Sequence, residues 1–262
     1  MRRLIPMLAL VTSIASSAHA AEPPASTPAL AAAKQQLQAG VSASQIDAIL
    51  QARAAFAALQ QQAPKDARIA CWIAVASWRA VPMLQSSDAA QAKRVCKDGI
   101  AAADRAIALD PRLADAVAIK AGLQGLSLNF NPSMAMTLGP EMEESYGRAE
   151  GMDATNPRVW LLKAMNTMHK PEFVGGGPKR AMPQFERAIA LFALQKSDDP
   201  NALDWGRADA EIWAGRCQLK LGEPQLAKAH YERALAIDPD NVWVSKVLLP
   251  AAEKERAGKA AK

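Results

Sequence analysis

Acidic and histidine side chains are the first candidates for chemistry in this sequence. Glu141, Glu143 and Glu144 form a carboxylate cluster of the kind that can act as a paired acid and base. We interpret them as acidic residues near the start of a helix, where they stabilise its dipole. His169 is a lone histidine near the end of another predicted helix, and we interpret it as structural or groove-lining. Because Gly-x-Ser-x-Gly and His-Glu-x-x-His motifs are also absent, we predict a protein that is not an enzyme.

Three cysteines, Cys71, Cys96 and Cys217, could form a disulfide or hold a metal. Their number is odd, and they lack the Cys-x-x-Cys spacing of zinc and redox sites. Cys71 and Cys96 are expected on neighbouring helices and are the best pair for a disulfide in an oxidising compartment. The alternative is that they are buried as small apolar side chains. His169 and His230 are isolated, so we predict no metal site and no cofactor.

A glycine-rich segment, Gly175–Gly177, precedes the next predicted helix. Such a segment can bind phosphate at a helix N-terminus. It lacks the Gly-Lys-Ser/Thr ending of the P-loop, because Pro178 and Lys179 follow it. We interpret it as a structural turn, with an anion site or a partner contact as the alternatives. A second insertion, residues 127–140, is rich in Asn, Pro and Gly, and we predict a loop that is either solvated or a lip over a groove.

The N-terminus is typical of a signal peptide. Arg2 and Arg3 precede an apolar run over residues 4–15, and the small-x-small pattern that signal peptidase recognises then ends at Ala20. The run is shorter than the roughly 20 residues that a membrane span needs. We therefore predict cleavage near Ala20 and a mature protein that is periplasmic or secreted.

The composition favours a helical protein and gives no sign of nucleic-acid binding. Hydrophobic residues make up 50% of the chain and aromatic residues only 5%, and alanine, the best helix former, is abundant. The formal net charge is +5, but removal of the signal peptide lowers it and no long run of like charges follows. We therefore predict no nucleic-acid partner. Charged residues interrupt every later apolar stretch, so we predict no membrane span in the mature chain.

The clearest repeat lies near the C-terminus. Residues 208–222 are predicted to form one helix and residues 225–237 a second, separated by a short turn. Gly215 in the first helix permits close packing, and Pro239 ends the second helix. The hairpin resembles the tetratricopeptide repeat (TPR), a unit of about 34 residues with small residues, an aromatic and a proline at fixed places. Gly215, Tyr231 and Pro239 match a small, the aromatic and the proline position of that family.

Further copies of the pattern occur upstream. Residues 104–111 repeat residues 232–239 almost residue for residue, weaker copies lie in 146–157 and 181–191, and a faint one lies in 52–64. The copies are further apart than the family's unit, so we interpret the repeat as degenerate. The residues assigned to structural TPR positions are Ala106, Pro111, Ala149, Ala181, Phe185, Ala188, Gly215, Ala227, Tyr231, Ala234 and Pro239.

The resemblance implies an all-α fold, an α-solenoid of about four to five degenerate TPR-like helix hairpins. A single hairpin cannot bury its apolar face, so several must stack. We predict a signal peptide (1–20), a flexible N-terminal leader (21–43), the repeat domain (44–250) and a charged C-terminal tail (251–262). The chain departs from the family at Glu211, where an aromatic side chain is usual.

In TPR proteins the first helix of each hairpin lines a concave groove, and the resemblance implies a partner-binding face there. Carried over by register, this face comprises Asp115, Leu126, Arg158, Met165, His169, Asp209, Arg216 and Lys220. Both charge signs and a flexible methionine would suit an extended peptide or the tail of a partner protein. The plainer alternative is a solvated helix face. The sequence specifies neither the identity of the partner nor the oligomeric state.

Residues 171–177, with Ala181, Phe185 and Trp205-Gly206, resemble a set of exported bacterial TPR proteins. This resemblance implies the fold and the compartment only. A looser similarity is to the helical periplasmic components that accompany some solute-transport binding proteins. It implies an alternative function, in which the chain is an accessory that binds a small ligand.

Overall fold

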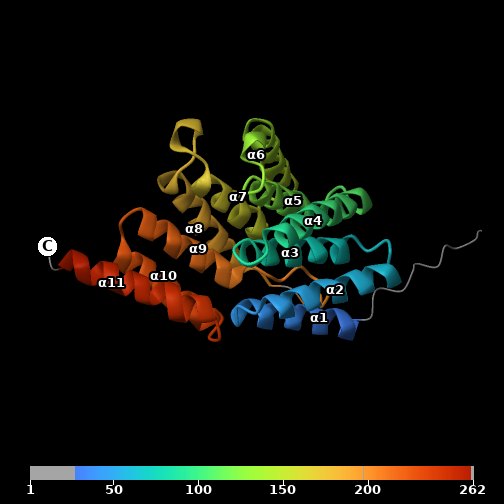
Figure 1. The fold of residues 1–262 in the computed structure, drawn as a ribbon, viewed down its shortest axis with the longest axis horizontal. Helices are drawn as coiled ribbons and strands as arrows, with labels where there is room; N and C mark the ends of the chain where they lie inside the picture. Colours follow the sequence, from blue (N-terminus) through green and yellow to red (C-terminus); the bar gives the residue numbers. More distant parts are fainter. Residues whose placement is uncertain (1–26, 197, 261–262) are drawn as a thin grey trace, which may run out of the picture.

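The computed structural model describes residues 27–196 and 198–260 (Figure 1). The predicted signal peptide and its cleavage site near Ala20 lie outside the described residues. Within the described part, the chain forms eleven α-helices and no strand, which confirms the predicted all-α fold. None of these helices is both long and apolar enough to cross a membrane.

Consecutive helices pair into five hairpins that stack side by side, followed by a final helix (Figure 1). The hairpins are α1 (Thr27–Ser42) with α2 (Ile46–Gln62), α3 (Ala67–Leu84) with α4 (Ala89–Leu109), α5 (Ala114–Ser127) with α6 (Ala135–Met152), α7 (Pro157–His169) with α8 (Pro178–Leu194), and α9 (Arg207–Lys220) with α10 (Pro224–Ile237). The remaining elements are η1 (Pro132–Met134), η2 (Glu172–Val174), the π-helical η3 (Val244–Leu248) and α11 (Leu249–Ala260). The predicted solenoid of helix hairpins is therefore confirmed.

The predicted flexible leader, residues 21–43, contains a complete helix, so that boundary was wrong. In α1, Leu30, Ala33 and Leu37 are at most 4% exposed and belong to the core. Their spacing of three and four residues places them on one helix face, which packs against α2. The composition before Leu30, rich in proline and hydroxyl side chains, favours a flexible leader, whereas the apolar spacing from Leu30 to Leu37 indicates a helix.

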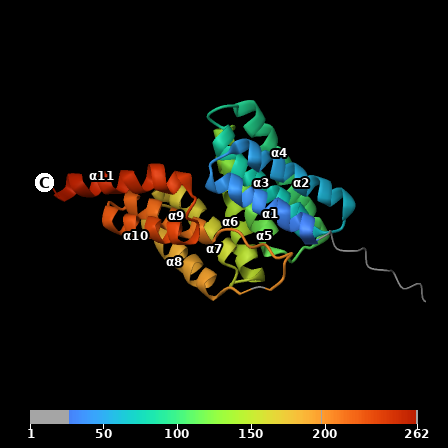
Figure 2. The same cartoon turned by 90° about the horizontal axis from the view of Figure 1, so that it is seen from below.

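The predicted charged tail, residues 251–262, likewise begins inside a helix. Figure 2 shows α11 extending away from the body of the molecule at the C-terminal end. Ala252 is fully buried in a small cluster with Tyr231 and Val244, whereas residues 253–258 are exposed. α11 therefore covers the last hairpin with a polar outer face, as the terminal element of a solenoid must.

Alanines fill the contact surfaces between the helices. The aligned Ala106, Ala149, Ala188 and Ala234 are all 0% exposed. The same holds for Ala181, Phe185, Ala227 and Tyr231, whereas Pro111 and Pro239 lie exposed just beyond the ends of α4 and α10. Small side chains let neighbouring helices approach closely, so the stack is dense without many aromatic residues.

Glu211, at a position where the resemblance to the TPR predicts an aromatic side chain, is buried in α9 and paired with α10. His230 Nδ1 lies 2.6 Å from its carboxylate, and Arg233 Nε donates to it at 3.1 Å. Burial alone would raise the pKa of Glu211, but the hydrogen bonds from His230 and Arg233 outweigh burial and lower it. A polar triad of Glu211, His230 and Arg233 thus joins the two helices.

Residues 127–140 were predicted to form a loop, but η1 and the start of α6 occupy most of this segment. The irregular part of the insertion is therefore shorter than predicted. The carboxylate cluster consequently lies well inside α6 and not near its start. Glu143 pairs with Lys170 at 2.9 Å and accepts a hydrogen bond from Asn166 at 2.8 Å. Glu143 therefore joins α6 to the end of α7, which is a structural role.

All three cysteines are free and buried, so no disulfide joins Cys71 to Cys96. Burial raises the pKa of all three thiols, and the pKa values of Cys96 and Cys217 are about 11. The thiols are therefore protonated at neutral pH and serve as small apolar side chains.

Close packing at Gly215 gives a test of the stack. A Cβ at this position would lie 2.5 Å from Cε1 of the buried Tyr231 ring. We expect Gly215→Ala to destabilise the protein by about 1–2 kcal/mol, because overpacking outweighs the better helix propensity of alanine. The new Cβ of Gly147→Ala, at an exposed position of α6, would meet no atom within 4 Å. This change should instead stabilise the protein by roughly 0.5–1 kcal/mol. Urea unfolding measures both changes, and effects of the same sign would contradict this packing.

Candidate functional site

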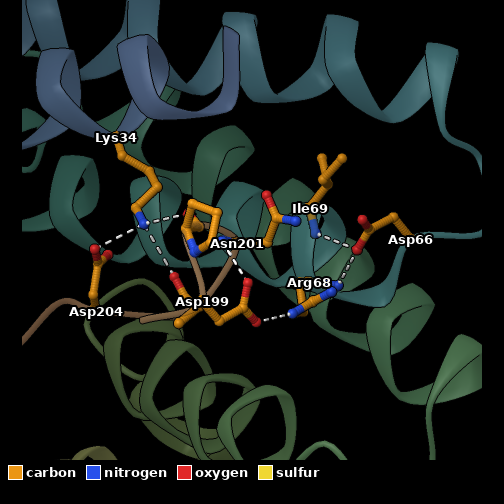
Figure 3. A network of polar contacts seen from close by, with 9 residues as sticks. Lys34, Asp66, Arg68, Ile69, Asp199, Asn201 and Asp204 are labelled. Carbon is orange, nitrogen blue, oxygen red and sulfur yellow. Dashed lines mark hydrogen bonds and ion pairs between the residues drawn. The ribbon is translucent and has the colours of Figure 1, made fainter. Parts of the chain in front are cut away.

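The inner face of the solenoid is partly covered by the chain itself. Residues 198–206, which we call the inner strap, lie in the connection from α8 to α9 and run beside α1 and α3 (Figure 1). Lys34 of α1 holds the strap through three contacts (Figure 3). Its Nζ donates to Pro200 O and Ala202 O, both at 3.2 Å, and pairs with Asp204 at 2.7 Å.

A second set of contacts ties the strap to α3. Arg68 pairs with Asp199 at 2.7 Å, as Figure 3 shows. Trp205 is 5% exposed, and its ring centroid lies 5.6 Å from that of Trp78. Arg79 stacks against both indoles, 4.8 Å from the centroid of Trp78 and 5.7 Å from that of Trp205. An extended peptide therefore cannot lie along this part of the inner face while the strap is in place.

The two ends of the solenoid also meet. Ser42 Oγ at the end of α1 donates to the Asp238 carboxylate just after α10 at 2.9 Å, and Gln38 Nε2 donates to it at 3.3 Å. Together with the strap, this contact closes the N-terminal hairpin onto the C-terminal one.

Three residues of the predicted partner-binding face are buried and paired within the chain. Asp115 of α5 pairs with Arg158 of α7, and each is 5% exposed. Asp209 of α9 is 8% exposed and forms a two-bond ion pair with Arg79 of α3. The predicted register placed these charges on the first helices of their hairpins, where each forms an ion pair with the first helix of another hairpin.

The other five residues of that prediction divide by exposure. Leu126 and Met165 are partly buried and pack against the core. His169 and Lys220 are exposed, and Arg216 is intermediate. Their role in binding remains a prediction.

Near the C-terminal end, the structure brings part of this set together with two indoles. The guanidinium of Arg216 lies 4.1 Å from the ring centroid of Trp213 and 5.2 Å from that of Trp243. The His169 ring meets Trp213 edge-on at 5.6 Å. We call His169, Trp213, Arg216, Lys220 and Trp243 the cationic–aromatic patch. Within the described part of the chain, no carboxylate lies within 4.0 Å of the charged nitrogens of Arg216 or Lys220.

The protonation of His169 follows from its neighbours. Partial burial of the ring is the main cause that lowers its pKa, and Arg216 and Lys220 lower it further. The imidazole is therefore neutral at pH 7. Nδ1 lies 2.8 Å from Met165 O, which can only accept, so Nδ1 carries the proton and Nε2 has a lone pair available.

The glycine-rich segment acts as the predicted turn. Gly177 has φ 98° and donates its N–H to Thr167 O at 2.8 Å, and Gly176 lies so close to Lys170 O that any side chain would clash. Gly175 has φ 85°, so the backbone geometry favours glycine at all three positions.

Sequence reasoning missed the inner strap and its anchors. Lys34 lies in the segment that was predicted to be a flexible leader, and Arg79 is not among the residues that were predicted to line the inner face. The Trp205-Gly206 pair entered the prediction only through a resemblance.

Beside the strap lie two adjoining cavities of about 360 and 350 Å³, which share Arg79 and Trp205 among their lining residues. Among the described residues, no group of three or more His, Cys, Asp or Glu side chains is placed to hold a metal ion.

The chain has a TPR-like helical repeat fold. Among solved structures, the HusA haemophore from Porphyromonas gingivalis is similar, with a TM-score of 0.55 and 20% identity over 74% of this chain and 91% of that one. The thermophilic TPR protein TTC0263 from Thermus thermophilus has a TM-score of 0.56 and 15% identity over 84% of this chain and 98% of that one. No protein-family model and no curated protein matches the chain. At these identities the likeness shows the fold alone.

The buried Asp115–Arg158 pair should be essential for stability. We expect Arg158→Met to destabilise the protein by about 3–5 kcal/mol, because it leaves the Asp115 carboxylate buried without its cation. Lys120→Met is a control, since it breaks a pair with Asp104 whose side chains are 30% and 52% exposed. That change should cost less than about 1 kcal/mol. Chemical denaturation followed by circular dichroism compares the two, and equal losses would refute the assignment.

Proposed function

We propose that this chain is an exported helical-repeat binding protein whose cationic–aromatic patch binds an acidic segment of a partner protein. The observation that carries the proposal is Arg216, which is held between Trp213 and Trp243 with no carboxylate among the described residues to pair with. The other inner-face arginines considered above, Arg79 and Arg158, both have such a carboxylate.

The patch has the physical properties of a binding site for a carboxylate. Burial lowers the pKa of Arg216, which means that its cation is incompletely solvated. An incoming carboxylate would compensate for that loss through charge-assisted hydrogen bonds. The two indoles fix the guanidinium in place, so little side-chain entropy is lost on binding. Arginine and tryptophan also dominate the binding energy of protein interfaces.

The position of the patch supports the same function. It lies on α7, on α9 and at Trp243 just before η3, whereas the inner strap pairs with α1 and α3. Exposed Lys220 adds a second cation beside His169. Export is supported by the signal-peptide pattern of residues 1–20. Mass spectrometry of the secreted protein tests export, because cleavage after Ala20 would make Ala21 the first residue.

Fluorescence anisotropy with labelled peptides tests the binding function. We expect a glutamate-rich peptide with a free C-terminal carboxylate to bind, and its lysine-rich counterpart not to bind. Arg216→Glu should weaken binding at least tenfold, of the order that loss of a central interface residue costs. Arg94→Glu on exposed α4 changes the net charge equally and should leave binding unchanged. Retained affinity in the Arg216 variant, or equal loss in the Arg94 variant, would exclude the patch.

A second candidate is favoured by one contact and one comparison. Because HusA is described as a haemophore, we propose haem binding at the same patch as the alternative function. His169 Nε2 could bind the iron, since the Nδ1 contact with Met165 O fixes the ring as in other metal-binding histidines. Arg216 and Lys220 could pair with the two propionates, and Trp213 offers an aromatic surface.

Titration with haemin distinguishes the two functions. Haem binding through His169 should shift the Soret absorption, and His169→Ala should abolish that shift. The same variant should leave binding of the acidic peptide nearly intact, because His169 is neutral. An identical spectrum for the wild type and His169→Ala would rule out iron ligation by this histidine.

A further inference from the structure

The cationic–aromatic patch continues onto the helix that ends the described chain. Trp243 directly precedes η3, and η3 runs without a break into α11. Val247 and Ala251 follow Trp243 at intervals of four residues, which places the three side chains on one side of this helix. We call Trp243, Val247 and Ala251 the apolar row. Val247 is 52% exposed and Ala251 is exposed as well, so water has access to the row.

The apolar row faces α9, whereas the side of the helix next to it faces α10. The guanidinium of Arg216 on α9 lies 5.2 Å from the ring centroid of Trp243. Leu248 and Ala252, each one position beyond a member of the row, are buried in the core cluster that contains Tyr231 of α10. The row therefore adjoins Arg216 and extends the patch along η3 and α11.

The charges around the row favour an anionic partner. Glu253 points to α10, where it pairs with a lysine at 3.2 Å. Burial raises the pKa of Tyr231 to about 12, Arg216 lowers it, and Glu255 raises it by less than Arg216 lowers it. The cation thus outweighs the carboxylate at the base of the patch. Exposed Lys254 adds a further cation, and no carboxylate among the described residues lies within 4.0 Å of its Nζ.

The spacing between Arg216 and Val247 defines which partner fits. Arg216 lies beside Trp243, and one helical turn, roughly 6 Å along the axis, separates Trp243 from Val247. Two residues of an extended chain span roughly 7 Å, and three span about 10 Å. An extended segment whose carboxylate pairs with Arg216 can therefore place another side chain on Val247 two or three residues further on.

Building on the proposed function, we infer that the partner's acidic segment is amphipathic. One carboxylate pairs with Arg216, and an apolar side chain two or three residues away packs on Trp243 and Val247. Charge complementarity selects the acidic residue, and burial of the exposed row selects the apolar one. Val247 is β-branched and stiff, so its side chain loses little entropy when it is covered. The row also begins at a π-helical turn, a rare element that is frequent at functional sites.

Fluorescence anisotropy with two labelled peptides of identical composition tests this partner class on the complete protein. Both peptides carry the same run of glutamates. In the first, a leucine lies two residues after the run, and in the second, ten glycine and serine residues separate the two. We expect the first peptide to bind about tenfold more tightly, because most of one leucine side chain becomes buried. Val247→Ser should remove this advantage, whereas Leu226→Ser, 49% exposed on α10, should preserve it.

The outcomes separate this partner class from the proposed function itself. Equal affinity of the two peptides, with binding that Arg216→Glu still weakens, would overturn the amphipathic partner alone. Failure of both peptides to bind would overturn the proposed function as well. Equal effects of Val247→Ser and Leu226→Ser would show that the leucine does not rest on the apolar row. Sedimentation velocity without peptide examines the other occupant, a second copy of the chain, and dimers that Val247→Ser dissociates would overturn the inference.

Nuclear magnetic resonance of valine methyl groups gives a readout that does not depend on the folding of any variant. With ¹³C-methyl-labelled wild-type protein, the first peptide should shift the signals of Val247 and leave those of Val75, which is buried in α3, in place. The second peptide should shift Val247 much less at equal saturation. Unchanged Val247 signals in the presence of the bound first peptide would exclude the apolar row from the interface.

Discussion

The structure depends on one constraint: each helix hairpin has an apolar face that only the next hairpin can cover. Alanines such as Ala106, Ala149 and Ala188 are fully excluded from solvent at these contacts. Small side chains set the distance between helices, and Gly215 against Tyr231 leaves no space for even one more methyl group. The register of every first helix is thereby fixed. This register decides which polar side chains face inward, and so it positions every site in the molecule.

On the inner face, the presence or absence of a carboxylate partner divides otherwise similar cations into two groups. Arg158 pairs with Asp115 of the adjacent hairpin and Arg79 pairs with Asp209 of the more distant fifth hairpin, so both arginines link repeats. Arg216 is held with comparable precision by aromatic rings, but no acid in the described part of the chain pairs with it. Removing one partner of a buried ion pair lowers stability, whereas a surface cation without a carboxylate partner can bind an anion. The ion pairs of Arg79 and Arg158 therefore stabilise the fold, whereas we propose that Arg216 binds a partner.

The fold could be predicted from the sequence because its signals are local. Proline at helix ends, alanine at helical spacing and the Tyr231 pattern lie within single hairpins. The inner strap could not be predicted, because Arg68 and Asp199 are 131 residues apart in the chain and nothing near either residue specifies the other. The register correctly placed Asp115 and Arg158 on the first helices. It could not show that the face folds against itself, since burial is a property of the assembled stack.

The contact between Ser42 and Asp238 joins positions 196 residues apart. An open solenoid resembles a linear chain of units, in which the outermost repeats fray first and order can spread from any point. Because this contact joins the first hairpin to the last, fraying at either end of the stack must also break it. The same closure raises the contact order, since a long loop must form before the last contacts do. We therefore expect this repeat array to unfold more cooperatively than an open stack of the same hairpins would.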